Sequence, residues 1–316
     1  MTKHIICIGG ATVDYTLKSL HALELSTSNP VTSFTALGGV AHNVALNLAS
    51  LTDQVQLQCV VGDDREGQQL LSHAQKKGII TDHSLILQNT MTSRYYAVLD
   101  HQGELHIALA DMQIYDHIPL HEFTASWDQW DKNNIIFADT NLSTAMLHHL
   151  IQLCEKKQIQ LCIDPVSIPK AKKLPHSLAG VFLIKPDRFE ATALTGIPIH
   201  SVDDCIKAGN MLLERGVQNV IISLGKSGYV IINKTVQAYF PALHVEHVVN
   251  VSGAGDAFVA GVLFELKQGA TLQQACITGS AAAALAVQSP HTVADTMSLA
   301  NVSYQINREN HHATIF

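Results

Sequence analysis

The sequence predicts an α/β fold built on a mainly parallel central sheet. Short apolar runs alternate with amphipathic stretches along the chain, which is typical of successive β-α units. The 316 residues are 47% apolar and 15% charged, and this composition indicates a compact globule rather than a disordered chain. No fixed-period repeat, low-complexity tract or linker interrupts the pattern. We therefore expect one domain over residues 1–316.

Six apolar runs are the expected strands of this sheet, and local signals mark the helices between them. The runs are residues 4–9, 56–61, 134–138, 160–163, 181–185 and 219–223. Ser143 is expected to cap a helix that continues to residue 157, and Ser201 a helix that Gly216 ends. Thr271 and Gln274 form a capping-box pattern before an alanine-rich helix that ends near residue 288.

Two further strand-like segments depart from the β-α alternation. Residues 92–99 and 104–110 are separated by Asp-His-Gln-Gly at 100–103, which has the chemistry of a hairpin turn. With an early strand-like region they predict a small β lid, with strands from about 15–35 and 92–110. A lid that excludes water suits an enzyme that must not hydrolyse its own ATP. An ordinary edge hairpin is the alternative.

Charge and hydropathy narrow the class of partner. The formal net charge is −7 and no basic block is present, which argues against nucleic acid as a partner. No apolar run reaches the length of about 18 residues that a membrane-spanning helix needs. The N-terminus lacks the organisation of a cleavable signal, and the six cysteines are scattered without a C-x-x-C pair. These features predict a cytoplasmic protein with no membrane partner.

The most informative stretch is Asn-Val-Ser-Gly-Ala-Gly-Asp at 250–256, expected at the start of a buried helix after a strand-like segment at 243–249. Gly253 and Gly255 let an anion approach the backbone, and the N–H groups of a first helical turn favour a phosphate. A carboxylate repels such a ligand, so Asp256 makes sense as a base for a substrate hydroxyl in phosphoryl transfer. An ordinary helix N-terminus with an acidic first turn is the alternative.

A second glycine pair, Gly38 and Gly39, opens a helix expected over 44–51. It would let a ligand hydroxyl lie against backbone N–H groups, while the side chain of Asn43 can both donate and accept. Asp14 follows the first strand, at the sheet edge where α/β proteins bind ligands, and could grip two vicinal sugar hydroxyls. A turn residue or cap is the alternative for Asp14.

Two more segments lie at strand ends. Asp187 and Glu190 are three residues apart, so on a starting helix they share one face and could hold Mg²⁺ through waters. A simple capping pattern is the alternative, and the spacing does not separate the two. The turn from Ser223 through Gly225 to Gly228 either passes beside nucleotide phosphates or only joins two strands.

Taken in order, these segments resemble the ribokinase-like (pfkB) carbohydrate kinase family over nearly the whole chain. Within the family, the branch that phosphorylates pseudouridine is the most similar. The residues that carry the likeness are Ser-Asn-Pro at 28–30, Gly-Gly-Val at 38–40 with Asn43, Asp-Met at 111–112, Asp-Pro-Val-Ser at 164–167, Lys-Pro at 185–186 with Glu190, and Asn-Val at 250–251. The resemblance implies a three-layer α/β/α fold with a small β lid.

The resemblance also implies an activity, the ATP-dependent phosphorylation of the 5′-hydroxyl of pseudouridine. Asp256 would be the catalytic base, and the N–H groups of Gly253, Ala254 and Gly255 would stabilise charge on the transferred group. The implied substrate contacts are Asp14, Gly38, Gly39 and Asn43 at the ribose, with Asn29, Asp111 and Asn141 at the nucleoside end. The implied ATP contacts are Lys185, Asp187, Ser223, Gly225 and Gly228.

The same likeness implies Mg²⁺ at Asp187 and Glu190, although the family generally carries Asn where this chain has Asp187. Dependence on a monovalent cation and the oligomeric state are left open, and the lid could supply the face of a homodimer. Two alternatives remain for the function. One is a kinase of another ribose-containing nucleoside or sugar, and the other is a non-catalytic sensor on the same fold.

Overall fold

The structure is a computed structural model, and it describes residues 4–313. Its main sheet has eight strands in the order β14-β13-β12-β11-β10-β9-β1-β4. The strands that pair in parallel are β4 (Val55–Gln58), β1 (Ile5–Ile8), β9 (Ile135–Asp139), β10 (Gln160–Asp164), β11 (Val181–Ile184) and β12 (Asn219–Ser223). Antiparallel β13 (Tyr229–Asn233) and β14 (Gln237–Phe240) complete the sheet. The predicted mainly parallel sheet is confirmed.

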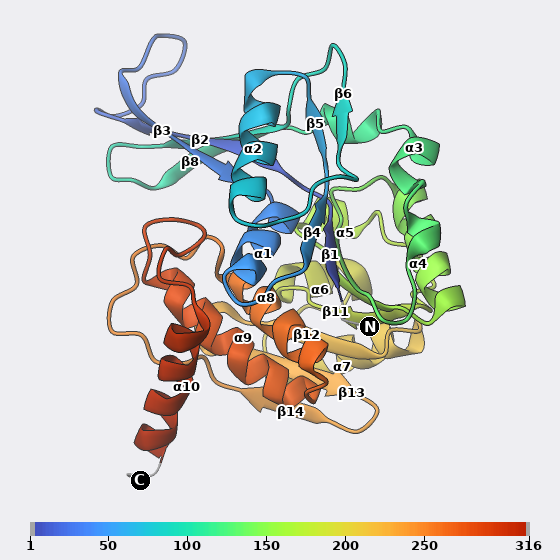
Figure 1. The fold of residues 1–316 in the computed structure, drawn as a ribbon. Coiled ribbons are helices and arrows are strands. Elements are labelled where there is room, and N and C mark those ends of the chain that lie inside the picture. The colour runs from blue at the N-terminus through green and yellow to red at the C-terminus, as the bar shows by residue number, and fades with distance from the viewer. Residues whose placement is uncertain (1–3, 314–316) are drawn as a thin grey trace.

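Helices cover both faces of this sheet (Figure 1). One face packs against α4 (Thr144–Lys157), α6 (Arg188–Thr195) and α7 (Val202–Glu214). The other face packs against α1 (Val40–Ala49), α2 (Arg65–Lys76), α8 (Ala254–Gln268) and α9 (Leu272–Val287), and α10 (Leu299–Ala313) lies against α9. Alternate residues of β1 serve the two cores, because successive side chains of a strand point to opposite faces. The result is a three-layer α/β/α arrangement.

Local helix signals were predicted well. Ser143 is the N-cap of α4, and its hydroxyl accepts a hydrogen bond from the Met146 N–H at 3.3 Å. Ser201 and Thr271 begin α7 and α9 with the two-way bonds of a capping box. These caps depend on residues only three positions apart, which is why the sequence reveals them.

Three boundaries differ from the expectation. The run at 56–61 is two strands, β4 and β5 (Val60–Gly62), and β5 pairs with β6 (Leu85–Leu87). Residues 243–249 form no strand; Val248 and Val249 are 59% and 58% exposed, so these apolar side chains are not part of a buried strand. Helix α1 begins at Val40 rather than 44, because Gly39 adopts a φ of 97° as its N-cap and accepts from the Asn43 N–H.

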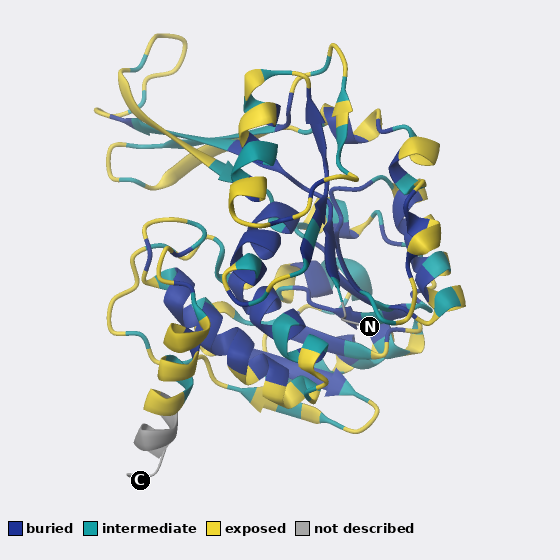
Figure 2. Ribbon diagram, viewed as in Figure 1, coloured by how far each residue is buried: buried dark blue, intermediate teal, exposed yellow. Residues whose placement is uncertain are grey.

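A second sheet of four strands stands off the main one, at the upper left of Figure 1. Its order is β3 (Val31–Gly38), β2 (Thr12–Ser19), β7 (Arg94–Leu99) and β8 (Leu105–Asp111). The β7-β8 turn is held by the Asp100 carboxylate, which accepts hydrogen bonds from two backbone N–H groups of the turn. Figure 2 shows the sheet largely in the colours of half-buried and exposed residues, and β8 is exposed along its whole length.

Two further sequence features have structural counterparts. All six cysteines are buried free thiols, and burial raises the pKa of Cys162, which keeps that thiol protonated. Across residues 4–313, no helix combines the length and the apolar character that crossing a membrane requires. Phe123 of the short helix α3 (Leu120–Thr124) is buried in the core that α4 covers, and the short helix α5 (Ile168–Ala171) packs against α6.

Candidate active site

The candidate residues gather where the parallel strands of the main sheet end. Asp139 and Asp164 are the last residues of β9 and β10, Lys185 directly follows β11, and Ser223 ends β12. The loop after β1 carries a glycine pair at 9–10. Ligands of open α/β sheets bind beyond this edge, so the topology brings side chains from distant parts of the chain to one place.

The N-terminus of α8 faces this edge without a side-chain cap. Its N-cap, Gly253, has a φ of 79°, and a Cβ there would overlap the carbonyl oxygen of Thr292. Glycine is therefore required at 253 by the fold. Gly255 is different, since a Cβ at 255 would lie an ordinary 3.5 Å from Lys185 Nζ. The glycine at 255 leaves open space beside an ammonium group and the N–H groups of the first helical turn.

Asp256 lies in this first turn, and its carboxylate reaches across to α1. Asn43 Nδ2 donates a hydrogen bond to Asp256 Oδ2 at 2.9 Å. Although the side chain is only half-buried, desolvation raises the pKa of Asp256 to about 7, with Asp164 adding to the rise and Asn43 and Lys185 opposing it. A carboxylate with a pKa near neutrality is suited to accept a proton at physiological pH.

Lys185 forms a buried ion pair beside the α8 N-terminus. Its Nζ lies 3.0 Å from Asp164 Oδ2, and both side chains are less than a tenth exposed. Burial alone would lower the pKa of Lys185, but the charges of Asp164 and Glu190 outweigh it and raise the pKa. Glu190 is also buried, and desolvation together with Asp164 raises its pKa to about 7. The cluster therefore keeps one positive charge among several carboxyl groups.

Asp187 is the N-cap of α6. Its Oδ1 accepts hydrogen bonds from the N–H groups of Phe189 and Glu190, both at 2.7 Å, and Glu190 Oε2 accepts from the Asp187 N–H at 2.8 Å. This reciprocal capping box is the alternative that the sequence pattern left open. Across the described part of the chain, no group of three or more His, Cys, Asp or Glu side chains is arranged to hold a metal ion.

The residues expected at the sugar lie on β2, at the end of β3 and at the start of α1. Asp14 Oδ1 accepts a hydrogen bond from Thr12 Oγ1 at 2.8 Å, and burial raises the pKa of the Asp14 carboxyl. A Cβ at Gly38 would overlap the Asp14 carboxylate, and one at Gly39 would overlap the backbone at Gly10. The glycine pair therefore makes room for Asp14 and for a chain crossing, whatever ligand lies there.

Asp139 connects the glycine loop after β1 to the start of α1, and it is not among the site residues expected from the sequence. Its Oδ2 accepts hydrogen bonds from the N–H groups of Gly10 and Ala41 at 2.8 and 2.9 Å, and its Oδ1 from the backbone and amide of Asn141. The other side of the Asn141 amide accepts from Lys170 Nζ. Asp139 and Asp164 share the signal that singled out Asp14, a carboxylate at a strand end, and that signal could have found them.

Two expected nucleoside contacts do not join this cluster. The Asn29 amide holds its own loop beyond the far end of β2, where it bonds the backbone N–H and carbonyl of Glu24, both at 2.8 Å. Asp111 pairs with Arg94, which in turn pairs with Val13. By the alternation of strand side chains, Asp111 therefore lies on the face of the four-stranded sheet opposite Asp14.

The expected nucleotide turn lies beside Asp187. The Ser223 N–H donates to the Pro186 carbonyl at 3.0 Å, and Gly225 has a φ of 59° in the short helix that follows. A Cβ at Gly228 would overlap the backbone at Phe240, so this glycine is needed for the β13-β14 crossing. The turn thus both joins two strands and borders the strand ends that carry the charged cluster.

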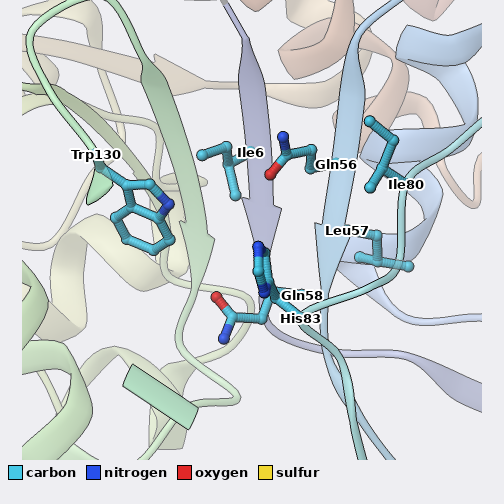
Figure 3. A pocket seen from close by; sticks show the side chains of 7 residues that line it. All are labelled: Ile6, Gln56, Leu57, Gln58, Ile80, His83 and Trp130. Carbon is cyan, nitrogen blue, oxygen red and sulfur yellow. The ribbon is translucent and has the colours of Figure 1, made fainter. Parts of the chain in front are cut away.

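A small crevice lies elsewhere in the molecule. Figure 3 shows that it is lined by side chains of β1 and β4 with Ile80, His83 and Trp130. None of the candidate residues lines it. Gln58, one of the lining residues, accepts a hydrogen bond at its Oε1 from the Trp127 indole N–H at 2.9 Å. The crevice is therefore a packing feature of the main sheet, separate from the cluster at the strand ends.

An uncapped helix N-terminus, a carboxylate beside it and a charged lysine at the strand ends are groups that a site for phosphoryl transfer to a small molecule needs. Comparison with known proteins specifies the class. The chain belongs to the pfkB family of carbohydrate kinases, whose pattern matches residues 2–298. The protein is therefore a sugar or nucleoside kinase with a ribokinase-like fold.

Individual relatives differ in the substrates that their names give. The chain is 29% identical over 299 residues to pseudouridine kinase of Escherichia coli strain K12, with 95% of each chain covered. It is 27% identical to guanosine-inosine kinase of Exiguobacterium acetylicum, over 90% of this chain and 94% of the relative. Ribokinase of Arabidopsis thaliana, solved in complex with ribose and ATP, has a TM-score of 0.82 at 17% identity, covering 97% and 99% of the two chains.

Proposed function

We propose that this protein transfers the γ-phosphoryl group of ATP to the 5′-hydroxyl of pseudouridine, giving pseudouridine 5′-phosphate and ADP. The observation that carries the proposal is the contact of Asp256 with Asn43, which joins the helix N-terminus suited to phosphate to the helix that begins beside Asp14. The choice of pseudouridine is supported by the 29% identity to a pseudouridine kinase and by Asn-Val at 250–251.

In the proposed step, Asp256 accepts the proton of the 5′-hydroxyl while that oxygen bonds to the γ-phosphorus. The bond from the γ-phosphorus to the β,γ-bridging oxygen breaks, and ADP leaves with its electron pair. The N–H groups of Gly253, Ala254 and Gly255 would stabilise the charge on the transferred group, with Lys185 beside them. Asp14 and the Gly39 backbone would hold the ribose, and the turn from Ser223 would border the nucleotide.

The charges near Lys185 suit a divalent cation in company with ATP. Asp164, Glu190 and Asp256 outnumber the single ammonium group, and burial, with the charge of Asp164 adding to it, raises the pKa of Glu190 and of Asp256. Mg²⁺ prefers oxygen ligands and is commonly held by one or two carboxylates, waters and substrate phosphates. Glu190 would hold it through water, whereas the Asp187 carboxylate serves as a helix cap. The ion would supply charge neutralisation at the phosphates.

A substrate panel tests the proposed function. Pseudouridine has a C-glycosidic link and a free N1–H, and a hydrogen-bond acceptor at that position would discriminate strongly against uridine. We expect ADP release to be fastest with pseudouridine when it is compared with uridine, guanosine, inosine, adenosine and ribose. Faster turnover of ribose or another nucleoside would overturn the assignment of pseudouridine as the substrate, and the protein would still be a kinase. Binding of a nucleoside without any turnover would favour the sensor.

The four-stranded sheet is proposed as a lid that also pairs with the lid of a second copy. The apolar side chains Leu105, Ile107 and Leu109 alternate along β8, are 47–58% exposed and share one face with Leu17 and Val98 of the same sheet. Burying such a face is favourable by about 25 cal/mol per Å². Contiguous exposed apolar patches mark interaction sites.

The Ile107→Lys variant should therefore shift the protein from dimer to monomer. A buried lysine at the centre of an apolar contact lacks a partner for its charge. Light scattering during gel filtration measures the mass, and His106→Lys, on the opposite face of β8, is the matched control. A wild-type protein that is monomeric at all concentrations, or an Ile107→Lys variant that stays dimeric, would contradict this pairing.

A further inference from the structure

The side-chain amide of Asn43 donates a hydrogen bond to the carboxylate of Asp256, the expected base. Asn43 is 5% exposed, and its Nδ2 donates to Asp256 Oδ2 across the gap between α1 and α8. The amide oxygen is buried and has no hydrogen-bond partner within the described residues. Reversing the amide would place this oxygen against the carboxylate, so the charge of Asp256 selects the orientation seen.

The rest of the Asp256 surroundings make this single donor important. The charged groups that act on Asp256 come from three strand ends: Asp164 after β10 and Asp139 after β9 raise its pKa, and Lys185 after β11 lowers it. Lys185 is itself paired with Asp164. His42, next to Asn43 on α1, has its pKa lowered to about 3 by burial, so it adds no charge at neutral pH. The carboxylate therefore has one neighbouring amide that both orients and stabilises its ionised form.

We propose that Asn43 is a positioning residue for the base: its Nδ2–H holds the Asp256 carboxylate toward the 5′-hydroxyl and stabilises the ionised state. This role rests on the proposed function and differs from the ribose contact expected of Asn43 from the sequence. It also explains why an asparagine is suited to this place. A carboxylate would repel Asp256, an aliphatic side chain would leave it without a donor, and Asn supplies a neutral donor at 2.9 Å.

The test is the pH dependence of kcat/KM in Asn43→Leu, a substitution of similar size without a donor. Asp256 must be ionised to act, so activity falls as the pH drops through its pKa, which the free enzyme reports in kcat/KM. Removing a donor to the ionised form raises that pKa. We expect the acid limb of kcat/KM to move upward by about one pH unit, which lowers kcat/KM at pH 7 by about 5-fold through lost ionisation alone.

Asn47 provides the matched control on the same helix. It is fully buried, lies one turn after Asn43, and its Nδ2 donates to the Asn43 carbonyl at 2.9 Å without touching Asp256. The Asn47→Leu variant should leave the acid limb where it is in the wild type, whatever it does to stability. If Asn43→Leu does not fold, Asn43→Ser, whose hydroxyl is too short to reach across to α8, replaces it and should show the same upward shift.

The possible results distinguish the positioning role of Asn43 from the role of Asp256 as the base. A raised KM for the nucleoside in Asn43→Leu with an unmoved acid limb would make Asn43 a ribose ligand and overturn the positioning role. An equal shift in Asn47→Leu would overturn it as well, since the effect would then be a general disturbance of α1. If Asp256→Asn is fully active, Asp256 is not the base, and the positioning role of Asn43 falls with it. The proposed kinase activity itself fails only if the wild-type protein releases no ADP with any nucleoside of the panel or with ribose.

Discussion

Replacing Asp256 with asparagine is expected to lower kcat by roughly 10²–10⁴-fold, the range typical for loss of a general base. The change removes the proton acceptor and keeps the size of the side chain. Because the Asp256 carboxylate reaches α1 through its hydrogen bond to Asn43, and the proposed ribose contacts are other groups, nucleoside affinity should change far less than the rate. Single-turnover kinetics and calorimetric binding of the nucleoside measure the two quantities separately.

Stability serves as the internal control for this variant. The pKa of Asp256 is raised in the folded protein to about 7, so ionising it costs stability as the pH rises from about 4 to 7. The neutral amide in Asp256→Asn has no such cost, so at pH 8 the variant should be at least as stable as the wild type. A fully active variant would show that another group takes the proton, and an unfolded one would contradict the charge balance described here.

Replacing Lys185 with methionine is expected to lower kcat/KM for ATP by roughly 10²–10³-fold, as when one preorganised donor to developing charge is lost. The ammonium group lies 3.5 Å from where a Cβ of residue 255 would be, and therefore beside the first turn of α8. The substitution also leaves Asp164 buried without its partner, which typically costs about 3–5 kcal/mol of stability.

A double variant separates the two effects of Lys185. In Asp164→Asn combined with Lys185→Met, no uncompensated charge of the pair remains, so thermal stability should recover most of the loss seen in Lys185→Met. Turnover should stay low, because the positive charge beside the phosphate site is still missing. Recovery of both stability and turnover would mean that Lys185 serves the fold alone.

Much of the fold could be predicted because its signals are local. The capping residues of α4, α7 and α9 act within one helical turn, and the apolar runs of β1 and β12 match the observed strands closely. The segment at 243–249 has the same apolar content but stays at the surface. Its structure depends on whether a neighbouring strand is available, and the sequence does not state that.

The motifs of the candidate site could be predicted from the sequence, but the hydrogen bonds that connect them could not. Asp139 bonds the backbone of residues 98 and 129 positions earlier in the chain, so no spacing rule reveals its role. The pair at 187 and 190 fitted a metal site and a capping box equally well, and only the hydrogen bonds distinguish them. The hydrogen bond between Asn43 and Asp256 spans 213 positions, and no sequence pattern places these two side chains together.

The four-stranded sheet carries Asp14, yet β8 at its edge is exposed throughout and β3 nearly so. Because this sheet buries few of its own side chains, a surface that packs against it would stabilise it. If the cover is a second copy, mass action links the sugar contact to protein concentration. A protomer diluted away from its partner would keep Asp256 in place and lose the support behind Asp14, the proposed ribose contact. Enzyme abundance in the cell would then set affinity for the nucleoside as well as total activity.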